Sequence, residues 1–209
     1  MIRTGGLTFR EFVMREPLLL ATIQEAILEF LRGRNDAVLF GAQAVNAYVD
    51  EPRMSQDVDL LSPRAKELAE EIRAYLQERF RVAMRVREIG AGRGFRIYQI
   101  QESGNRHLAD IRPWRTMPLT QTIDQVLVAA PAELIAQKII AYHQREGKPK
   151  AFTDRRDLAM LLLKFPELKL ESSAVRERLI AADADETILK SWREIVAQEI
   201  KPTEEDDEF

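Results

Sequence analysis

The segment Asp57–Leu61 constrains the fold most, because it places two carboxylates within an otherwise apolar stretch. Successive side chains of a β-strand point to opposite faces, so Asp57 and Asp59 share one face. Two like charges on one face repel each other unless a cation lies between them. We therefore predict a strand at 57–61 with a divalent cation at Asp57 and Asp59. The alternative is a strand whose outer face is polar without a ligand.

The residue types available for metal binding narrow the choice of ion. The 209 residues include no cysteine and two histidines, which excludes disulfide scaffolds, cysteine zinc sites, iron–sulfur clusters and three-histidine sites. Oxygen ligands favour Mg²⁺ or Mn²⁺, often completed by substrate phosphates. His107 and His143 have no partner at ligand spacing in the sequence, so we expect neither to be a ligand.

The overall charge and the chain ends suggest an ordinary cytoplasmic protein. The 31 Lys and Arg residues nearly balance the 34 Asp and Glu residues, so the formal charge of −3 creates no global field for nucleic acid. No signal peptide or membrane-spanning stretch is recognisable, so we expect no membrane association. The acidic run at the end predicts a solvated tail at 204–209.

Hydrophobic periodicity predicts the α+β class, with an α/β core followed by a helical part. Strands are predicted at 37–40, 57–61, 81–89, 95–101 and 107–111. Helices are predicted at 18–31, 43–49, 63–80, 131–146, 153–165, 172–182 and 186–200. We therefore expect a mixed five-stranded sheet flanked by helices in a core at 1–120, with a helical C-terminal subdomain at 121–203.

Gly41 stands between the first predicted strand and the helix that follows it. The free N–H groups of a helix N-terminus bind anions, and a cation is expected nearby at Asp57 and Asp59. Metal-bridged phosphates would suit both, and the missing Gly-x-x-x-x-Gly-Lys pattern excludes a P-loop. Taken alone, Gly41 and Ala42 also suit a tight turn without a ligand.

Two segments carry a resemblance to a known family: Gly41–Tyr48, and the Arg-x-Ser-x-Asp-x-Asp motif at 53–59. They resemble the nucleotidyltransferase superfamily of the DNA polymerase β fold, in its minimal and abortive-infection (AbiEii toxin-like) branch. Asp110 fits the third aspartate of that branch. Lys138 and the segment 154–158 resemble its helical C-terminal signature, so the similarity extends over about residues 17–165.

The resemblance implies transfer of an NMP from an NTP to a hydroxyl acceptor, which could be an RNA end, a protein or a small molecule. Asp57, Asp59 and Asp110 would be catalytic and hold Mg²⁺ or Mn²⁺, with Asp110 accepting the hydroxyl proton. The residues implied in NTP binding are Gly41, Ala42, Gln43, Arg53, Ser55 and Lys138. The branch also implies toxin activity, with a cognate antitoxin as a partner. A homodimer is compatible with the resemblance.

One departure from the family pattern leaves alternatives open. Ala42 stands where the family carries Gly or Ser, and alanine has no hydroxyl to donate to phosphate. The donor could come from Gln43 or Ser55, or the protein could be a catalytically silent fold that binds nucleotide or a protein partner. A glycosyltransferase with an Asp-x-Asp motif ranks lower, because that class predicts a longer segment before Asp57.

Three further residues have simpler interpretations beside the implied ones. Lys138 alone fits a lysine whose stem lies along an amphipathic helix while its ammonium reaches solvent. Asp154 and Asp157, also candidate site residues, fit the first turn of a helix capped by Thr153 and stabilised by its dipole.

Overall fold

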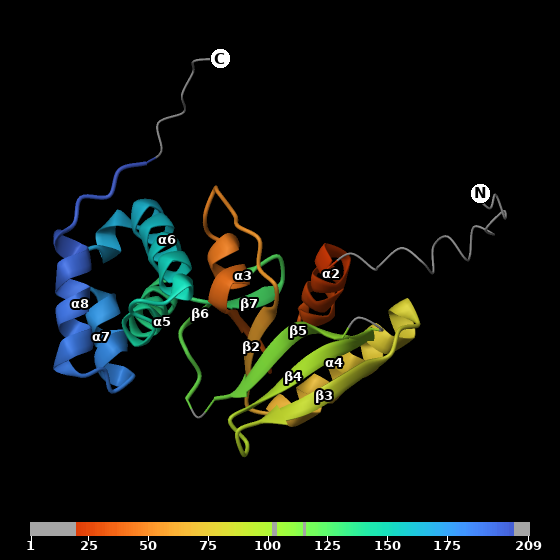
Figure 1. Ribbon diagram of the computed structural model, residues 1–209. Helices are drawn as coiled ribbons and strands as arrows, with labels where there is room; N and C mark the ends of the chain where they lie inside the picture. Colours follow the sequence, from red (N-terminus) through yellow and green to blue (C-terminus); the bar gives the residue numbers. More distant parts are fainter. Residues whose placement is uncertain (1–19, 102–103, 115, 203–209) are drawn as a thin grey trace, which may run out of the picture.

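A computed structural model describes residues 20–101, 104–114 and 116–202 (Figure 1). The predicted acidic tail lies outside these residues. The helices are α2 (Leu20–Leu31), α3 (Gly41–Asn46), α4 (Ala65–Phe80), α5 (Pro131–Gln144), α6 (Pro149–Lys164), α7 (Ala174–Ala181) and α8 (Glu186–Ala197), with a 3₁₀ turn at Pro166–Leu168. The strands are β1 (Val38–Phe40), β2 (Val58–Ser62), β3 (Met84–Ile89), β4 (Gly94–Gln101), β5 (Gly104–Pro113), β6 (Thr120–Ile123) and β7 (Val126–Ala129).

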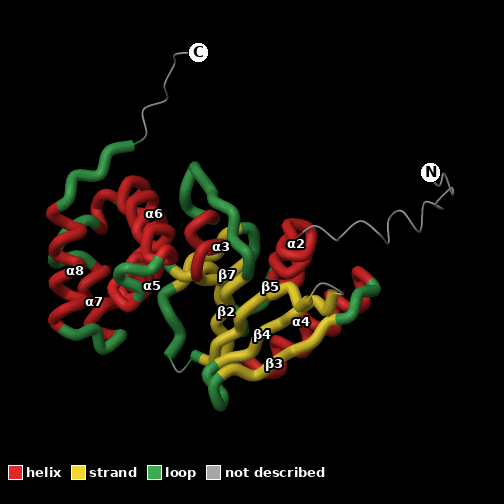
Figure 2. Tube along the Cα trace, viewed as in Figure 1, coloured by secondary structure: helices red, strands yellow, loops and turns green. Residues whose placement is uncertain are grey.

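The described strands form one mixed sheet in the order β3-β4-β5-β2-β1-β7-β6 (Figure 2). Two neighbouring pairs are parallel, β2 with β5 and β1 with β7, and the other pairs are antiparallel. The predicted α+β class, with a mixed sheet flanked by helices and a helical C-terminal part, is confirmed.

The sheet has seven strands, so the predicted number of five is wrong. Neither β6 nor β7 was predicted. β6 has one apolar residue among four, and the four-residue apolar run of β7 leads almost directly into the helix that begins at Pro131. The turn between them places Asp124 and Gln125 at φ values of 47° and 67°. Positive φ at both central residues is the geometry of a two-residue hairpin, usually signalled by Asn-Gly or Asp-Gly. Without a glycine, this hairpin carries a weak sequence signal.

The core lies between the sheet and α4, which packs across β2, β3, β4 and β5. Val58 and Leu60 of β2 are fully buried on one face of the sheet. The apolar stripe of α4 is also fully buried and includes Leu68, Ile72 and Leu76. The alternation within β2 therefore separates an apolar face, used for packing, from a polar face left for chemistry.

The C-terminal helices form a second layer beside the sheet (Figure 1). Proline at the first position of both α5 and α6 suits a helix start, because its missing N–H has no partner there. α5 contacts α6, α7, α8 and also α3, so it connects this layer to the sheet. None of the described helices has the length and apolar character needed to cross a membrane. The division of the chain into 1–120 and 121–203 stays a prediction.

Replacing Leu60 by alanine tests the role of β2 in the core. The cavity left at a fully buried leucine should lower the free energy of unfolding by about 2–5 kcal/mol. Urea denaturation of the purified protein measures this loss. Met54→Ala is the control, because Met54 is 94% exposed and should change stability by less than about 0.5 kcal/mol. Equal effects of the two substitutions would contradict the packing described here.

Candidate active site

The parallel pairing of β2 with β5 brings the three predicted aspartates together. Asp59 lies directly opposite Asp110 in the register of the two strands, at the usual strand spacing of about 4.8 Å. Asp57 lies two residues before Asp59, at the entry to β2. The polar face of the sheet therefore carries a cluster of carboxylates at its centre.

Asp110 is held by Arg96 and His107. Arg96 Nε donates a hydrogen bond to Asp110 Oδ1 at 2.8 Å, and His107 Nε2 lies 3.0 Å from the same oxygen. Burial alone would raise the pKa of Asp110, but the hydrogen bonds from His107 and Arg96 outweigh it and lower that pKa. Asp110 is therefore ionised at neutral pH.

His107 belongs to the same cluster, and the prediction that it has no partner at ligand spacing is wrong. Its Nδ1 lies 3.4 Å from Asp57 Oδ2, while its Nε2 faces Asp110. Residues three apart on a regular strand point to opposite faces. Here the register shifts between Ile97 and Tyr98, so Tyr98 pairs with His107 although Ile97 pairs with Ala109. This bulge puts His107 and Asp110 on one face, and nothing in the sequence marks it.

The cluster offers the donor atoms that a divalent cation needs. Asp57, His107 and Asp110 each present a ligand atom, and these atoms lie within 4.8 Å of one another. Asp59 adds a further carboxylate beside them, and burial, followed by the charge of Asp57, raises its pKa to about 6. This excess of buried negative charge would be relieved by a bound cation, so the residues fit such an ion.

Gly41 allows the chain to approach Asp59 closely. Its φ of +69° is a left-handed conformation that favours glycine. A Cβ atom on Gly41 would overlap Oδ2 of Asp59 and lie 2.9 Å from its Cβ. Both the backbone conformation and the lack of space for a Cβ atom thus require glycine at the strand–helix junction. Its sequence context had suggested only a tight turn.

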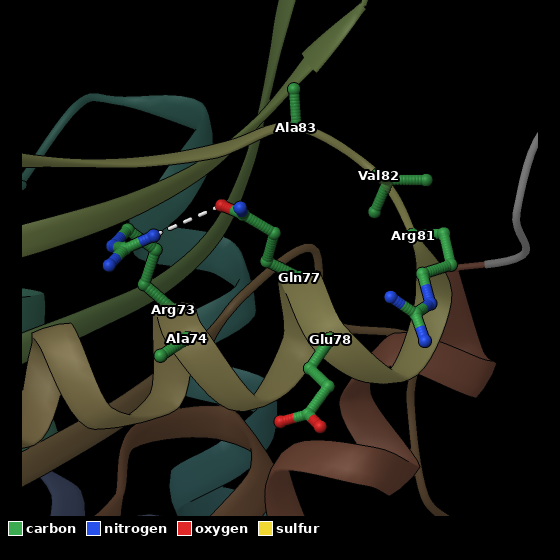
Figure 3. A pocket seen from close by; sticks show the side chains of 7 residues that line it. All are labelled: Arg73, Ala74, Gln77, Glu78, Arg81, Val82 and Ala83. Carbon is green, nitrogen blue, oxygen red and sulfur yellow. Dashed lines mark hydrogen bonds between the residues drawn. The ribbon is translucent and has the colours of Figure 1, made fainter.

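A cavity of about 910 Å³ opens between the polar face of the sheet and the helices α5 and α6. Most of the predicted site residues line it together: Gly41, Ala42, Arg53, Ser55, Asp57, Asp59, Asp110, Lys138 and Asp154. Two are not among its lining residues, Gln43 and Asp157. A separate hollow at the C-terminal end of α4 is lined by none of the predicted site residues (Figure 3).

An ion-pair network forms part of the cavity wall and extends behind it to the buried Asp157. Lys138 Nζ is 2.7 Å from Asp157 Oδ2 and 3.2 Å from Asp154 Oδ1. Arg53 donates to both oxygens of Asp157, from Nε at 2.6 Å and from Nη2 at 2.8 Å. Arg145 Nη1 donates to Asp154 Oδ2 at 2.6 Å. The network ties α5, α6 and the segment before β2 together around one lysine.

The simpler interpretations of these residues are wrong. Lys138 is only 8% exposed, so its ammonium does not reach out to solvent. α6 begins at Pro149 rather than Thr153, so its first turn contains no acidic residue. Asp154 and Asp157 therefore do not act through the helix dipole, and Thr153 is not the cap. Their carboxylates, almost completely buried, balance Lys138, Arg53 and Arg145.

A glutamine that sequence reasoning missed organises the loop beside the cluster. Gln24 of α2 is buried; its Nε2 donates to the Ser55 carbonyl at 2.8 Å, and its Oε1 accepts from Gln43 Nε2 at 3.1 Å. The Ser55 hydroxyl donates to the carbonyl of Asp57 at 3.0 Å. Both side chains proposed to replace a hydroxyl at Ala42 thus have protein partners. The available signal was a polar residue on the apolar face of α2, between Leu20 and Ile27.

Comparison with known proteins identifies the fold. Residues 25–208 match the family model described as Nucleotidyl transferase AbiEii toxin, Type IV TA system. A search of curated proteins finds no match. Among solved structures, the Megavirus polyadenylate synthase is similar with a TM-score of 0.56 and 16% identity, over 70% of this chain and 32% of that one. The chain therefore spans about a third of that enzyme's length.

Two Helicobacter pylori proteins are similar over most of their length. JHP933 matches with a TM-score of 0.52 and 16% identity, over 84% of this chain and 87% of that one. A protein described as a candidate nucleotidyltransferase matches with a TM-score of 0.53 and 15% identity, over 91% of this chain and 93% of that one. At these identities the likeness shows the fold alone, which is the predicted nucleotidyltransferase fold.

Gly41→Ala should damage the cluster more than the same change elsewhere. A left-handed alanine costs about 1–2 kcal/mol, and the overlap with Asp59 should add about 1–3 kcal/mol. Gly33→Ala is the matched control, because Gly33 has a φ of +73° but open space around its Cβ position. Urea denaturation of both variants measures the difference. Equal losses would show that the close approach to Asp59 has no energetic consequence.

The raised pKa of Asp59 predicts a pH-dependent stability. Because its carboxyl holds a proton more tightly in the folded protein, stability should fall as pH rises from about 4 to 6 and stay lower above that. Asp59→Asn should remove this loss and raise the free energy of unfolding at pH 8 by on the order of 2–3 kcal/mol.

Urea denaturation in EDTA at pH 5 and pH 8 measures that effect. The control is Asp124→Asn, an exposed turn residue at which asparagine tolerates the positive φ. A variant Asp59→Asn that is no more stable than the native protein at pH 8 would contradict the assigned burial of charge.

Proposed function

The chain belongs to the AbiEii nucleotidyl transferase toxin family of type IV toxin–antitoxin systems, and from this membership we propose that it transfers an NMP from an NTP to a hydroxyl acceptor. The observation that carries the proposal is the register of Asp59 opposite Asp110, beside Asp57, on the floor of the cavity. In the reaction, the acceptor oxygen bonds to the α-phosphorus as the bond to pyrophosphate breaks, and the hydroxyl proton is released.

Asp57, Asp59 and Asp110 would hold Mg²⁺ or Mn²⁺. Such an ion, when bound, neutralises phosphate charge and stabilises both the attacking and the leaving oxygens. Asp110 would also accept the proton of the acceptor hydroxyl. Its lowered pKa means that the carboxylate is unprotonated when the acceptor hydroxyl arrives and can accept a hydrogen bond from it. His107 contacts both Asp57 and Asp110, so we assign it the role of positioning these carboxylates.

Lys138 and Arg53 would neutralise the phosphates of the bound NTP. Both side chains line the cavity and are held by Asp157, which keeps two long cationic side chains in place before the substrate arrives. Transfer of a phosphoryl group depends mostly on such positioning and charge stabilisation. Gly41, Ala42 and Ser55 would contact the triphosphate at the same wall, and Gln43 would act through Gln24 rather than directly.

Family membership extends the proposal to partners. The acceptor would be an RNA end, a protein or a small molecule, and the activity would be that of a toxin with a cognate antitoxin. An NTP substrate would place the protein in the cytoplasm. We also propose a homodimer and a separate helical subdomain at 121–203.

A second function is favoured by the wall around Ala42. Ala42 carries no hydroxyl, and Gln43 and Ser55 already have hydrogen-bond partners within the protein. With fewer free hydrogen-bond donors in this wall, the triphosphate would bind more weakly. The corresponding candidate is a protein that binds nucleotide, or a protein partner, without turnover.

Label transfer from α-labelled NTPs distinguishes the two functions. With Mg²⁺ or Mn²⁺, the native protein should transfer label to total RNA, to proteins or to small molecules. Asp57→Asn should reduce transfer by a factor of about 100 or more, because it removes a charge that holds the cation. Gel electrophoresis and thin-layer chromatography measure the products.

His143→Gln is the matched control, since His143 lies outside the cavity and bonds to Ser191 and Thr187. It should transfer label at the native rate. Nucleotide that raises the melting temperature with no transfer to any acceptor would support the silent candidate. If no NTP changes the melting temperature with either metal, nucleotidyl transfer and silent nucleotide binding both fail, and only the binding of a protein partner is left.

A further inference from the structure

The sheet has a polar face that the described helices leave open over β3 and β4 and that continues over β5 into the cavity. α4 is the helix that packs on β3 and β4, and Figure 1 shows these strands in front of it. Val86 and Ile97 point toward α4, and Ile97 is fully buried. The alternate residues Arg85 and Arg87 therefore lie on the opposite, open face, and both are exposed.

A row of charged residues crosses this open face to the carboxylate cluster. Arg87 pairs with Arg96, Arg96 with Asp110, and Asp110 with Asp59 in the registers of four neighbouring strands. Three steps of about 4.8 Å span about 14 Å from the edge of the sheet to Asp59. The row thus runs directly from an exposed edge strand into the cavity.

The outer half of this row is electrostatically unfavourable by itself. Arg87 and Arg96 are directly opposite, and like charges in such cross-strand pairs are destabilising. Arg96 is engaged by Asp110, but the Arg87 side chain makes no hydrogen bond or ion pair with the residues that the structure describes. An anion on the open face would relieve this repulsion.

An aromatic side chain lies beside the row. Tyr98 pairs with Arg85 across the strands, and the Arg85 guanidinium lies 5.8 Å from the centre of the Tyr98 ring. On its other side the Tyr98 ring lies 5.5 Å from the ring of His107. Arg85, Tyr98 and His107 therefore form a line of planar groups parallel to the row of charges.

Arg112 continues the positive charge into the cavity. It is exposed, lies two residues after Asp110 on β5, and lines the cavity wall. Its guanidinium covers the Phe40 ring at 5.4 Å from the centre. A chain with a formal charge of −3 thus gathers four arginines on one open face next to its candidate active site.

We propose that this arginine face, made of Arg85, Arg87, Arg96, Tyr98 and Arg112, binds the end of a single-stranded RNA and leads its terminal hydroxyl to Asp110. Cations in a row neutralise successive phosphates, and an aromatic ring stacks on an unpaired base. Unpaired bases and free ends are the parts of RNA that proteins bind in this way. The inference rests on the proposed function for its last step, in which the RNA oxygen displaces pyrophosphate from the NTP and its proton passes to Asp110.

Binding of a labelled single-stranded RNA 12-mer to the full chain, without nucleotide or metal, tests the arginine face. Fluorescence anisotropy should show that Arg85→Gln with Arg87→Gln weakens binding by about tenfold or more at low salt. The slope of log affinity against log salt should fall by about 1.4, for two lost phosphate contacts. Tyr98→Ala should weaken binding by about tenfold and leave the salt slope unchanged.

The matched control is Arg32→Gln with Arg176→Gln, which removes the same charge at two exposed arginines outside this face. It should change affinity by less than about twofold. Equal weakening by both double variants would overturn the proposal, because binding would then follow net charge rather than the arginine face. A native protein that binds no RNA, or that labels only proteins or small molecules, would also overturn it.

Nucleotide binding separates this proposal from the proposed function. Arg85 and Arg87 do not line the cavity, so their double variant should keep the native shift in melting temperature with NTP and Mn²⁺. If the native protein shows no such shift while RNA binding still depends on these arginines, the proposed function fails and the arginine face stands. If nucleotide binds normally and RNA binding ignores the arginines, the arginine face fails alone.

Discussion

The parallel pairing of β2 with β5 concentrates negative charge at one point. Several of the surrounding side chains neutralise part of that charge. Asp59 and Asp110 are neighbours across the two strands, and Asp57 adds a third carboxylate. Arg96 and His107 balance Asp110, whereas Asp59 responds to its burial with a raised pKa. Charge that the protein does not neutralise itself is what makes the cavity suited to a cation and to phosphates.

A second electrostatic unit links the C-terminal helices to this point. Asp157 is fully buried and bonds to Arg53 and Lys138, which come from the segment before β2 and from α5. A buried carboxylate needs such partners, because leaving a charge unpaired in the interior costs several kcal/mol. The same ion pairs therefore anchor α6 to the rest of the protein and orient two cations toward the cavity.

Much of the arrangement could be predicted from local patterns. Alternation identified the polar face of β2, and the order of the motif residues indicated the family to which the chain belongs. Patterns failed where the structure departs from a regular period or is too short to show one. The β6–β7 hairpin has four residues per strand, and the bulge in β5 moves His107 to the face of Asp110.

The sequence by itself determined which residues carry charge and which strand faces are apolar, because these follow from residue type and a period of two. Only the tertiary structure decided which charges meet. Strand register set Arg87, Arg96, Asp110 and Asp59 in one row, and helix packing buried Lys138 between Asp154 and Asp157. Both depend on contacts between segments far apart in the chain, whose energies no local pattern contains.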